Sequence, residues 1–271
     1  MIADVRLYPS YSEWNTKWGA PDGYPVERPL LILNRLNEDP DPARYGPFGF
    51  QRTSETRRFE YPWAFLNARI EPGMRVLDVG GGLNGLQFVA ALEGAEVVNV
   101  DPAADIRFPR SPQDLGTHLL AGDDHARLNQ LLGTNVTLIR KKVQDSGLAA
   151  GSFDRAFCLS VLEHVDADEA RSMLAAVGDL LAPGGRFLVT IDLFLDVQPF
   201  GVRDHNFYGE NHDIHQLLDG LDVELEEGDT KELLGFPDFD FDGLVSRIPV
   251  LLKKSRYPVL SQAFILCKPG A

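Results

Sequence analysis

A run of glycines beside an acidic residue is the part of this sequence that points most clearly to chemistry. Residues 78–85 read Asp-Val-Gly-Gly-Gly-Leu-Asn-Gly. Glycine is needed in a loop when the turn requires unusual backbone angles or when a ligand approaches the backbone closely. The run therefore predicts a loop that passes under a bound ligand, with Gly80, Gly81 and Gly82 beneath it.

Two classes of ligand use a glycine loop of this kind. Gly80, Gly82 and Gly85 satisfy the pattern G-x-G-x-x-G, in which a helix amino terminus accepts a dinucleotide's pyrophosphate. Asp101, about 20 residues further on, would then bind a ribose. Asp78 argues against a dinucleotide, because its carboxylate would repel a pyrophosphate on the same backbone. A ligand with a cationic amino group suits this acid better.

The elements around the loop alternate between short β-rich runs and helical periodicity, which is typical of βαβ units and a parallel sheet. Strands are predicted at residues 75–79, 96–100, 136–141, 153–159, 186–191 and 260–267. Helices are predicted from the glycine loop to Gly94, around 125–132, and through 170–181, where Pro183-Gly184-Gly185 ends the helix. The many prolines of the first seventy residues exclude long helices there.

Several motifs in order resemble those of the class I S-adenosylmethionine-dependent methyltransferases, from about residue 75 to 191 and again at the last strand. The segments that carry the resemblance are Val-Leu-Asp-Val-Gly-Gly-Gly at 76–82, Val-Asn-Val-Asp-Pro at 98–102, Val-Gln-Asp at 143–145, the run from Ser152 to Val165, and Leu-Ala-Pro-Gly-Gly-Arg-Phe-Leu-Val at 181–189. The resemblance implies a Rossmann-like α/β fold. That fold is a three-layer α/β/α sandwich whose seven-stranded sheet is mostly parallel, with an antiparallel last strand.

The same resemblance implies S-adenosylmethionine as the cofactor and assigns residues to it. Asp78 and the glycine loop would hold the amino-acid end, Asp101 the ribose hydroxyls, and Pro102 would lie close to the adenine. Gln144 and Asp145 would contact the adenine, although the same residues also suit a turn.

Two further cofactor residues are expected. Asn84 stands where many family members have glycine, so it either makes a side-chain contact or caps the following helix. Ser160 ends a strand at the edge where open α/β sheets bind ligands, although it would also suit a helix cap.

Histidines are the candidate general bases. His164 follows the fourth strand, and His205 lies in a polar segment that we assign to the acceptor pocket; either would remove the proton of an acceptor hydroxyl. A packing role for His164 and a surface loop for His205 are the plain alternatives. His212, Asp213 and His215 carry metal-ligand chemistry but no established spacing, so no metal site is assigned.

The amino-acid composition restricts the kinds of molecule that the protein is expected to bind. The 271 residues include 40 acidic and 26 basic side chains, a formal charge of −14 that disfavours nucleic acid and anionic membranes. The two cysteines exclude a disulfide framework, and no secretory leader or apolar run of about 18 residues is evident. We expect a cytoplasmic protein, a monomer or homodimer, that acts on a small molecule.

The predicted organisation is a lid or cap segment at 1–70, followed by a cofactor-binding domain at 71–271 with a substrate-pocket insertion at about 192–248. The predicted activity is methyl transfer to oxygen, nitrogen or carbon, with release of S-adenosylhomocysteine. Three alternatives stay open: transfer or cyclisation of the aminocarboxypropyl arm with release of methylthioadenosine, a nicotinamide-dependent oxidoreductase, and a non-catalytic binding subunit.

Overall fold

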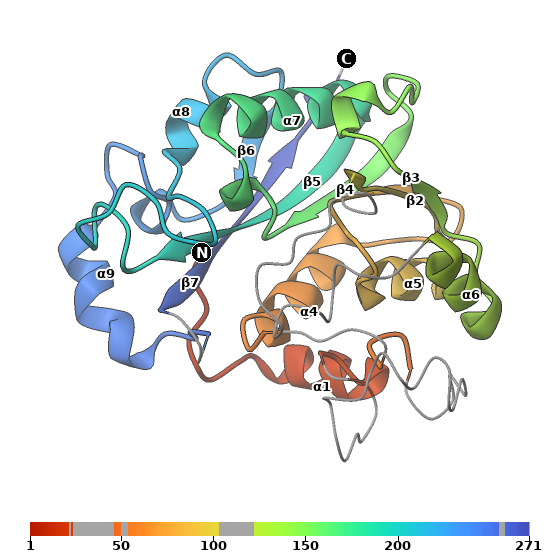
Figure 1. The fold of residues 1–271 in the computed structure, drawn as a ribbon, viewed down its shortest axis with the longest axis horizontal. Helices are drawn as coiled ribbons and strands as arrows, with labels where there is room; N and C mark the ends of the chain where they lie inside the picture. Colours follow the sequence, from red (N-terminus) through yellow and green to blue (C-terminus); the bar gives the residue numbers. More distant parts are fainter. Residues whose placement is uncertain (22, 24–45, 50–53, 103–121, 255–257, 271) are drawn as a thin grey trace. The chain divides into compact units, whose positions relative to one another are not determined.

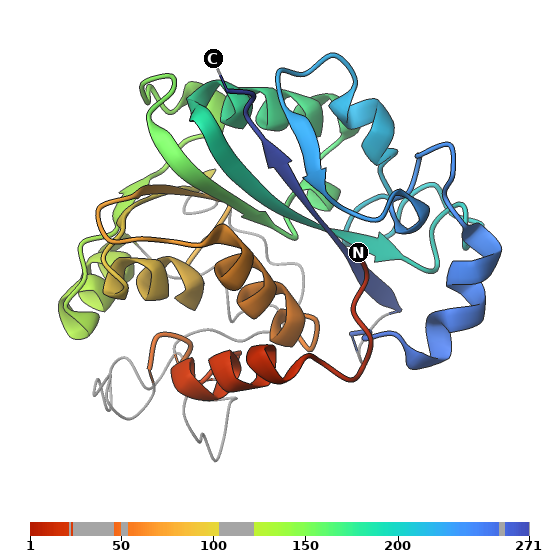
Figure 2. The same cartoon turned by 180° about the vertical axis from the view of Figure 1, so that it is seen from behind.

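The structure is a computed structural model and describes residues 1–21, 23, 46–49, 54–102, 122–254 and 258–270. Within these ranges the chain forms two compact units, residues 8–146 and residues 1–7 with 147–271. The predicted irregular connection around Pro109 and Pro112 lies outside the described residues. Figure 1 labels the elements, and Figure 2 shows them from behind.

The unit of residues 8–146 is built on three parallel strands in the order β3-β2-β1. Its elements are α1 (Pro9–Trp18), α4 (Arg57–Ala68), β1 (Arg75–Val79), α5 (Gly85–Leu92), β2 (Glu96–Val100), α6 (Gly122–Leu132), β3 (Thr137–Ile139) and the 3-10 turn η3 (Val143–Asp145). α1 lies beside α4 (Figures 1 and 2), and α5 packs on β2. β1 and β2 pair from Arg75 with Glu96 to Val79 with Val100, so both strands end at the same edge.

The second unit contains four strands in the order β4-β5-β7-β6. Its elements are β4 (Phe153–Leu159), η4 (Leu162–His164), α7 (Ala167–Leu180), β5 (Leu181–Phe194), α8 (Ile214–Leu218), β6 (Glu224–Glu227), η5 (Thr230–Glu232), α9 (Phe241–Arg247), η6 (Ile248–Val250) and β7 (Val259–Cys267). β4 and β5 are parallel, while β7 runs antiparallel to both β5 and β6. α7 packs on β5 and on α8.

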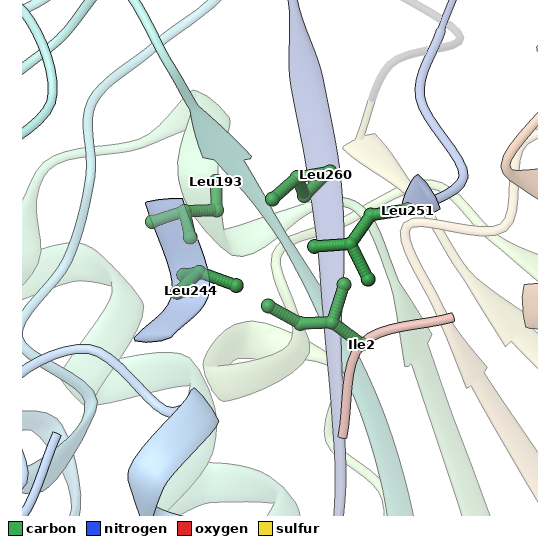
Figure 3. Packing of buried hydrophobic residues seen from close by; sticks show 5 residues of the cluster. All are labelled: Ile2, Leu193, Leu244, Leu251 and Leu260. Atoms are coloured by element: carbon green, nitrogen blue, oxygen red, sulfur yellow. The ribbon is translucent and has the colours of Figure 1, made fainter. Parts of the chain in front are cut away.

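The amino terminus is part of this second unit. Ile2 forms an antiparallel bridge with Gln262 of β7, and Asp4 does so with Leu251. Figure 3 shows Ile2 packed with four leucines, Leu193, Leu244, Leu251 and Leu260, all of which are buried. Burial of each such side chain contributes about 1.5 to 3 kcal/mol, so this cluster fixes the chain start and α9 against the strands.

The predicted fold class is confirmed. The described residues of the two units supply seven strands, and the last in the chain, β7, runs antiparallel to the strands on both its sides, β5 and β6. The predicted strands at 75–79, 96–100 and 153–159 have the predicted limits. Both cysteines are free thiols. None of the described helices is both long enough and apolar enough to cross a membrane.

Three local predictions were wrong, and one strand was missed. β3 is shorter than predicted, with only Thr137–Ile139 in the strand. Helix α7 ends at Leu180, and β5 begins at Leu181 rather than at Arg186, because Leu181 pairs with Phe153 of β4. Strand β6, which pairs with β7, was not predicted. Helix α4 extends through Pro62 because seven of its side chains are buried, which offsets a cost of about 3 kcal/mol for an internal proline.

Candidate cofactor and acceptor sites

The glycine loop follows β1 directly and has the backbone that its sequence requires. Gly80 and Gly82 have φ angles of 68° and 53°, in the left-handed region that side chains with a Cβ rarely adopt. Gly81 is a glycine for a different reason, since a Cβ there would lie 2.1 Å from Oδ2 of Asp78. Space and backbone conformation therefore both explain the run of three glycines.

Asn84 has both of the roles considered from the sequence. Its Nδ2 donates to Oδ2 of Asp78 at 2.8 Å, and its Oδ1 accepts from the backbone N–H of Gln87 at 3.1 Å as the cap of α5. The asparagine that departs from the family pattern thus joins the helix start to the acid of the loop.

Asp78 is a buried carboxyl with a perturbed proton affinity. The pKa of Asp78 is raised to about 7, chiefly by burial and also by the nearby charge of Asp101, whereas the hydrogen bond from Asn84 and the charge of Arg57 act in the opposite direction. Desolvation disfavours the ionised form of an acid. A cation placed beside Asp78 would restore the charged carboxylate, so the site favours a cationic ligand group.

Asp101 lies against the same loop, at the end of β2. Its Oδ2 accepts from the backbone N–H of Gly82 at 2.6 Å, and the N–H of Gly80 donates to the carbonyl of Val100 at 2.9 Å. Pro102 follows Asp101 directly and is partly buried. The structure therefore brings together Asp78, Asn84, Asp101 and the glycines, as the sequence predicts.

Gln144 and Asp145 lie in η3, a single turn after β3. The backbone N–H of Asp145 donates to the carbonyl of Lys142 at 3.0 Å, which agrees with the turn alternative. Contact of these two residues with adenine stays a prediction.

Three polar side chains form a buried cluster in the second unit. Ser160, at the end of β4, has a φ of 50°, a conformation uncommon outside glycine, asparagine and aspartate. Its Oγ donates to Oδ1 of Asp192 at 3.3 Å, and Asp192 forms an ion pair with Lys254 through Oδ2. Both charged side chains are buried. Sequence reasoning missed Lys254, because nothing in the pair Lys253-Lys254 indicates which lysine is buried.

The two candidate bases differ in their surroundings. Nδ1 of His164 lies against the carbonyl of Tyr208, so in the neutral ring this nitrogen carries the proton and Nε2 keeps a lone pair. Nε2 lies 3.8 Å from the buried carboxylate of Glu163. His205 is exposed on its loop. The assignment of either histidine as a base stays a prediction.

The three residues with metal-ligand chemistry are not brought together. Nε2 of His212 donates to the carbonyl of Leu162 at 2.8 Å, Asp213 caps α8 by accepting from Gln216, and His215 packs edge-on against the ring of Phe236. Within the described ranges, no three histidine, cysteine or acidic side chains form a group able to hold a metal ion.

Comparison with solved structures shows the fold. The cyclase SpnF has a TM-score of 0.54 at 15% identity, over 92% of this chain and 100% of that chain. The 1,6-didemethyltoxoflavin-N1-methyltransferase of Burkholderia thailandensis, with bound 1,6-didemethyltoxoflavin and S-adenosylhomocysteine, has a TM-score of 0.52 at 16% identity, over 99% of this chain and 94% of that chain.

Comparison of sequences shows the family. A ubiquinone biosynthesis O-methyltransferase of Xanthomonas axonopodis pv. citri (strain 306) is 35% identical over 132 residues, 47% of this chain and 48% of that protein. The chain thus matches about half the length of this curated relative. The family model for a methyltransferase domain matches residues 54–224. This match agrees with the predicted methyltransferase family. Because it covers more than half of the sequence, the chain belongs to the methyltransferase domain family.

Proposed function

We propose that this protein transfers the methyl group of S-adenosylmethionine to an oxygen atom of a small molecule and releases S-adenosylhomocysteine. The observation that carries the proposal is the buried carboxyl of Asp78 beside Asn84 and the glycine loop. Because the pKa of Asp78 is raised, a cation beside it would stabilise its ionised form. The ammonium at the amino-acid end of the cofactor would be that cation.

The other described groups of the loop fit the same ligand. Asp101 offers a carboxylate, the usual partner of a ribose diol, at the end of the strand next to β1. A dinucleotide fits less well, because a pyrophosphate seated on the loop would lie beside two acids whose mutual repulsion already raises the pKa of Asp78. We therefore assign Asp78, Gly80, Gly81, Gly82, Asn84 and Asp101 to cofactor binding, with Pro102, Gln144, Asp145 and Ser160 as further contacts.

Proton removal is the chemical step that side chains of this chain would perform. When bound, S-adenosylmethionine would supply an electrophilic methyl group on a sulfonium, which is a good leaving group. The protein then has to align the donor and the acceptor and exclude water. Nε2 of His164 would take the proton of the acceptor hydroxyl, while the carbonyl of Tyr208 holds the ring in the required tautomer. Glu163 would stabilise the imidazolium that forms. His205 is the alternative base.

An oxygen acceptor is supported by the relatives named O-methyltransferase. The net charge of −14 supports a small molecule rather than nucleic acid as the acceptor and, with the two free cysteines, a cytoplasmic location. We propose a lid role for residues 1–70 and an acceptor role for residues 192–248, although β6 shows that part of the latter segment is sheet.

The test is to identify the nucleoside product. The protein is incubated with S-adenosylmethionine carrying a deuterated methyl group and with a metabolite extract, and the products are analysed by mass spectrometry. We expect S-adenosylhomocysteine together with a small molecule that gains the labelled methyl on oxygen. Methylthioadenosine would instead reveal transfer or cyclisation of the aminocarboxypropyl arm. Neither product in any extract, with no binding of S-adenosylhomocysteine, would overturn the proposal.

A further inference from the structure

A chain of buried side-chain hydrogen bonds lies behind the glycine loop, and the proposed function does not use it. Gln87 and Asn99 are fully buried, and His125 is 3% exposed. They come from three different elements, α5, β2 and α6. Nε2 of His125 lies 2.9 Å from Oε1 of Gln87, and Nδ2 of Asn99 donates to the same oxygen at 3.0 Å.

Two side chains of this hydrogen-bond chain meet at one backbone atom, the carbonyl oxygen of Gly82. Nδ2 of Asn99 donates to it at 2.7 Å and Nε2 of Gln87 at 3.2 Å; the latter nitrogen also donates to the carbonyl of Asn84 at 3.1 Å. Both hydrogens of the Asn99 amide are therefore used. Its Oδ1 is buried and has no hydrogen-bond partner among the described residues. Because an unpaired buried acceptor is unfavourable, the amide is oriented for its two donor hydrogens rather than for its oxygen.

The protonation of the network is fixed by its acceptors. Because Oε1 of Gln87 can only accept, Nε2 of His125 must carry a hydrogen. Burial, and then the charge of Arg140, lower the pKa of His125 to about 4, so the ring is neutral at ordinary pH. Among the described residues, Asp101 accepts from the N–H of Gly82 and Asp78 lies beside Gly81. The network itself therefore donates to Gly82 without changing charge between about pH 5 and pH 8.

Gly82 is in consequence held on both sides. Its carbonyl oxygen accepts hydrogen bonds from Asn99 and Gln87, and its N–H donates to Oδ2 of Asp101. These two groups belong to the two rigid peptide planes that meet at the Cα of Gly82, where φ is 53°. Fixing the carbonyl plane therefore limits the direction of the N–H plane, and with it the position of the Asp101 carboxylate.

We propose that Gln87, Asn99 and His125 are positioning residues for the cofactor, which act through Gly82 to set the carboxylate of Asp101 for the ribose. This inference rests on the proposed function. It makes a specific claim about the affected part of the ligand: the network controls binding of the nucleoside half, whereas Asp78 controls binding of the amino-acid half.

The first test replaces the donors of Asn99. In Asn99→Asp, a carboxylate of the same shape faces the Gly82 carbonyl, and we expect the Kd of S-adenosylhomocysteine at pH 7.5 to rise by about tenfold or more. Methylthioadenosine shares the ribose but lacks the amino acid, and its Kd should rise by a similar factor. The matched control is Asn129→Asp on α6, where Nδ2 donates to the carbonyl of Val136 at 2.8 Å. That variant should lower the thermal midpoint but leave both Kd values unchanged.

The second test gives a signature that a purely structural role would not produce. In Gln87→Glu, the ionised side chain would face the carbonyls of Gly82 and Asn84, whereas the protonated side chain could still donate to one of them. The ratio of the variant's Kd to the wild-type Kd should therefore fall as the pH is lowered from 8 to 5.5. The ratio removes the pH dependence that Asp78 gives to both proteins.

The outcomes separate the two proposals. If wild-type protein binds neither S-adenosylhomocysteine nor methylthioadenosine, the proposed function fails. If wild-type protein binds both and the folded Asn99→Asp and Gln87→Glu variants bind equally well at every pH, the positioning role is wrong. An effect on S-adenosylhomocysteine without one on methylthioadenosine would also overturn it, because the network would then act on the amino-acid end.

Discussion

Asp78 lies in an environment that disfavours the ionised form of its carboxyl. A buried acid with a pKa near 7 destabilises the folded protein at neutral pH, because the unfolded chain ionises the same group near 3.8. The ammonium of the cofactor, in the proposed function, would remove this cost when it binds beside Asp78. Such a trade of stability for binding is common in functional sites.

Asp78→Asn should therefore stabilise the ligand-free protein. The amide keeps an oxygen for Asn84 but has no charge to desolvate. From the pKa difference, the gain in free energy of unfolding is up to about 4 kcal/mol above pH 7, and it should decline towards zero as the pH falls to about 4. Urea unfolding of both proteins at several pH values measures this. A variant less stable than wild type at pH 8 would show that the burial of Asp78 has no such cost.

Ligand binding should depend on the same proton. The ammonium of S-adenosylhomocysteine favours ionised Asp78, so its affinity should weaken as the pH is lowered from 7.5 to 5.5, by up to about tenfold per pH unit below the pKa near 7. Methylthioadenosine has no ammonium and is the control, with an affinity that changes much less. Calorimetric titrations of both ligands at each pH would decide, and equal pH dependence for the two would contradict the assignment of Asp78.

The roles of His164 and His205 as general base can be tested separately. If His164 removes the acceptor proton, His164→Ala should lower single-turnover methyl transfer by about a hundredfold while the Kd of S-adenosylhomocysteine changes little. His205→Ala should have that effect only if His205 is the base. Wild-type rates in both variants would leave positioning alone as the source of catalysis at this step.

At the scale of elements, strand ends position the polar groups of each unit. β1 and β2 pair in register, so Asp78 lies opposite Asn99, and Asp101 follows at the shared edge. In the other unit, Ser160 directly follows β4, and Asp192 lies near the end of β5, where the buried Lys254 neutralises its charge. The buried charge of Asp192 is thus paired with a cation from outside its own strand.

Lys254→Met should destabilise the protein, because it leaves the carboxylate of Asp192 buried without its cation. Breaking a buried ion pair in this way costs about 3 to 5 kcal/mol. The double variant Asp192→Leu with Lys254→Met should recover most of that loss, since two apolar side chains replace both charges. Denaturant unfolding of the single and double variants tests this, and an additive loss in the double variant would show that the two side chains act independently.

At the scale of the whole molecule, local signals explain what could be predicted from the sequence. β1, β2 and β4 are short apolar runs bounded by turn residues, so these strands were predictable. A run of three glycines after a strand has few explanations other than a tight loop beneath a ligand, so the residues around Asp78 were predictable as well. β6 could not be predicted, because Glu-Leu-Glu-Glu has little apolar character and is a strand only through its pairing with β7. The partnership of Gln87 with His125 spans 38 residues and leaves no local pattern.

Binding of S-adenosylhomocysteine to wild-type protein and to Asp101→Ala tests the central claim most directly. Loss of a hydrogen-bonded pair with a charged acceptor costs about 1.5 to 3 kcal/mol, so the account predicts measurable binding by the wild type and roughly tenfold to hundredfold weaker binding by the folded variant. Calorimetry that finds equal affinity in the two proteins, or no binding by the wild type, would contradict the account.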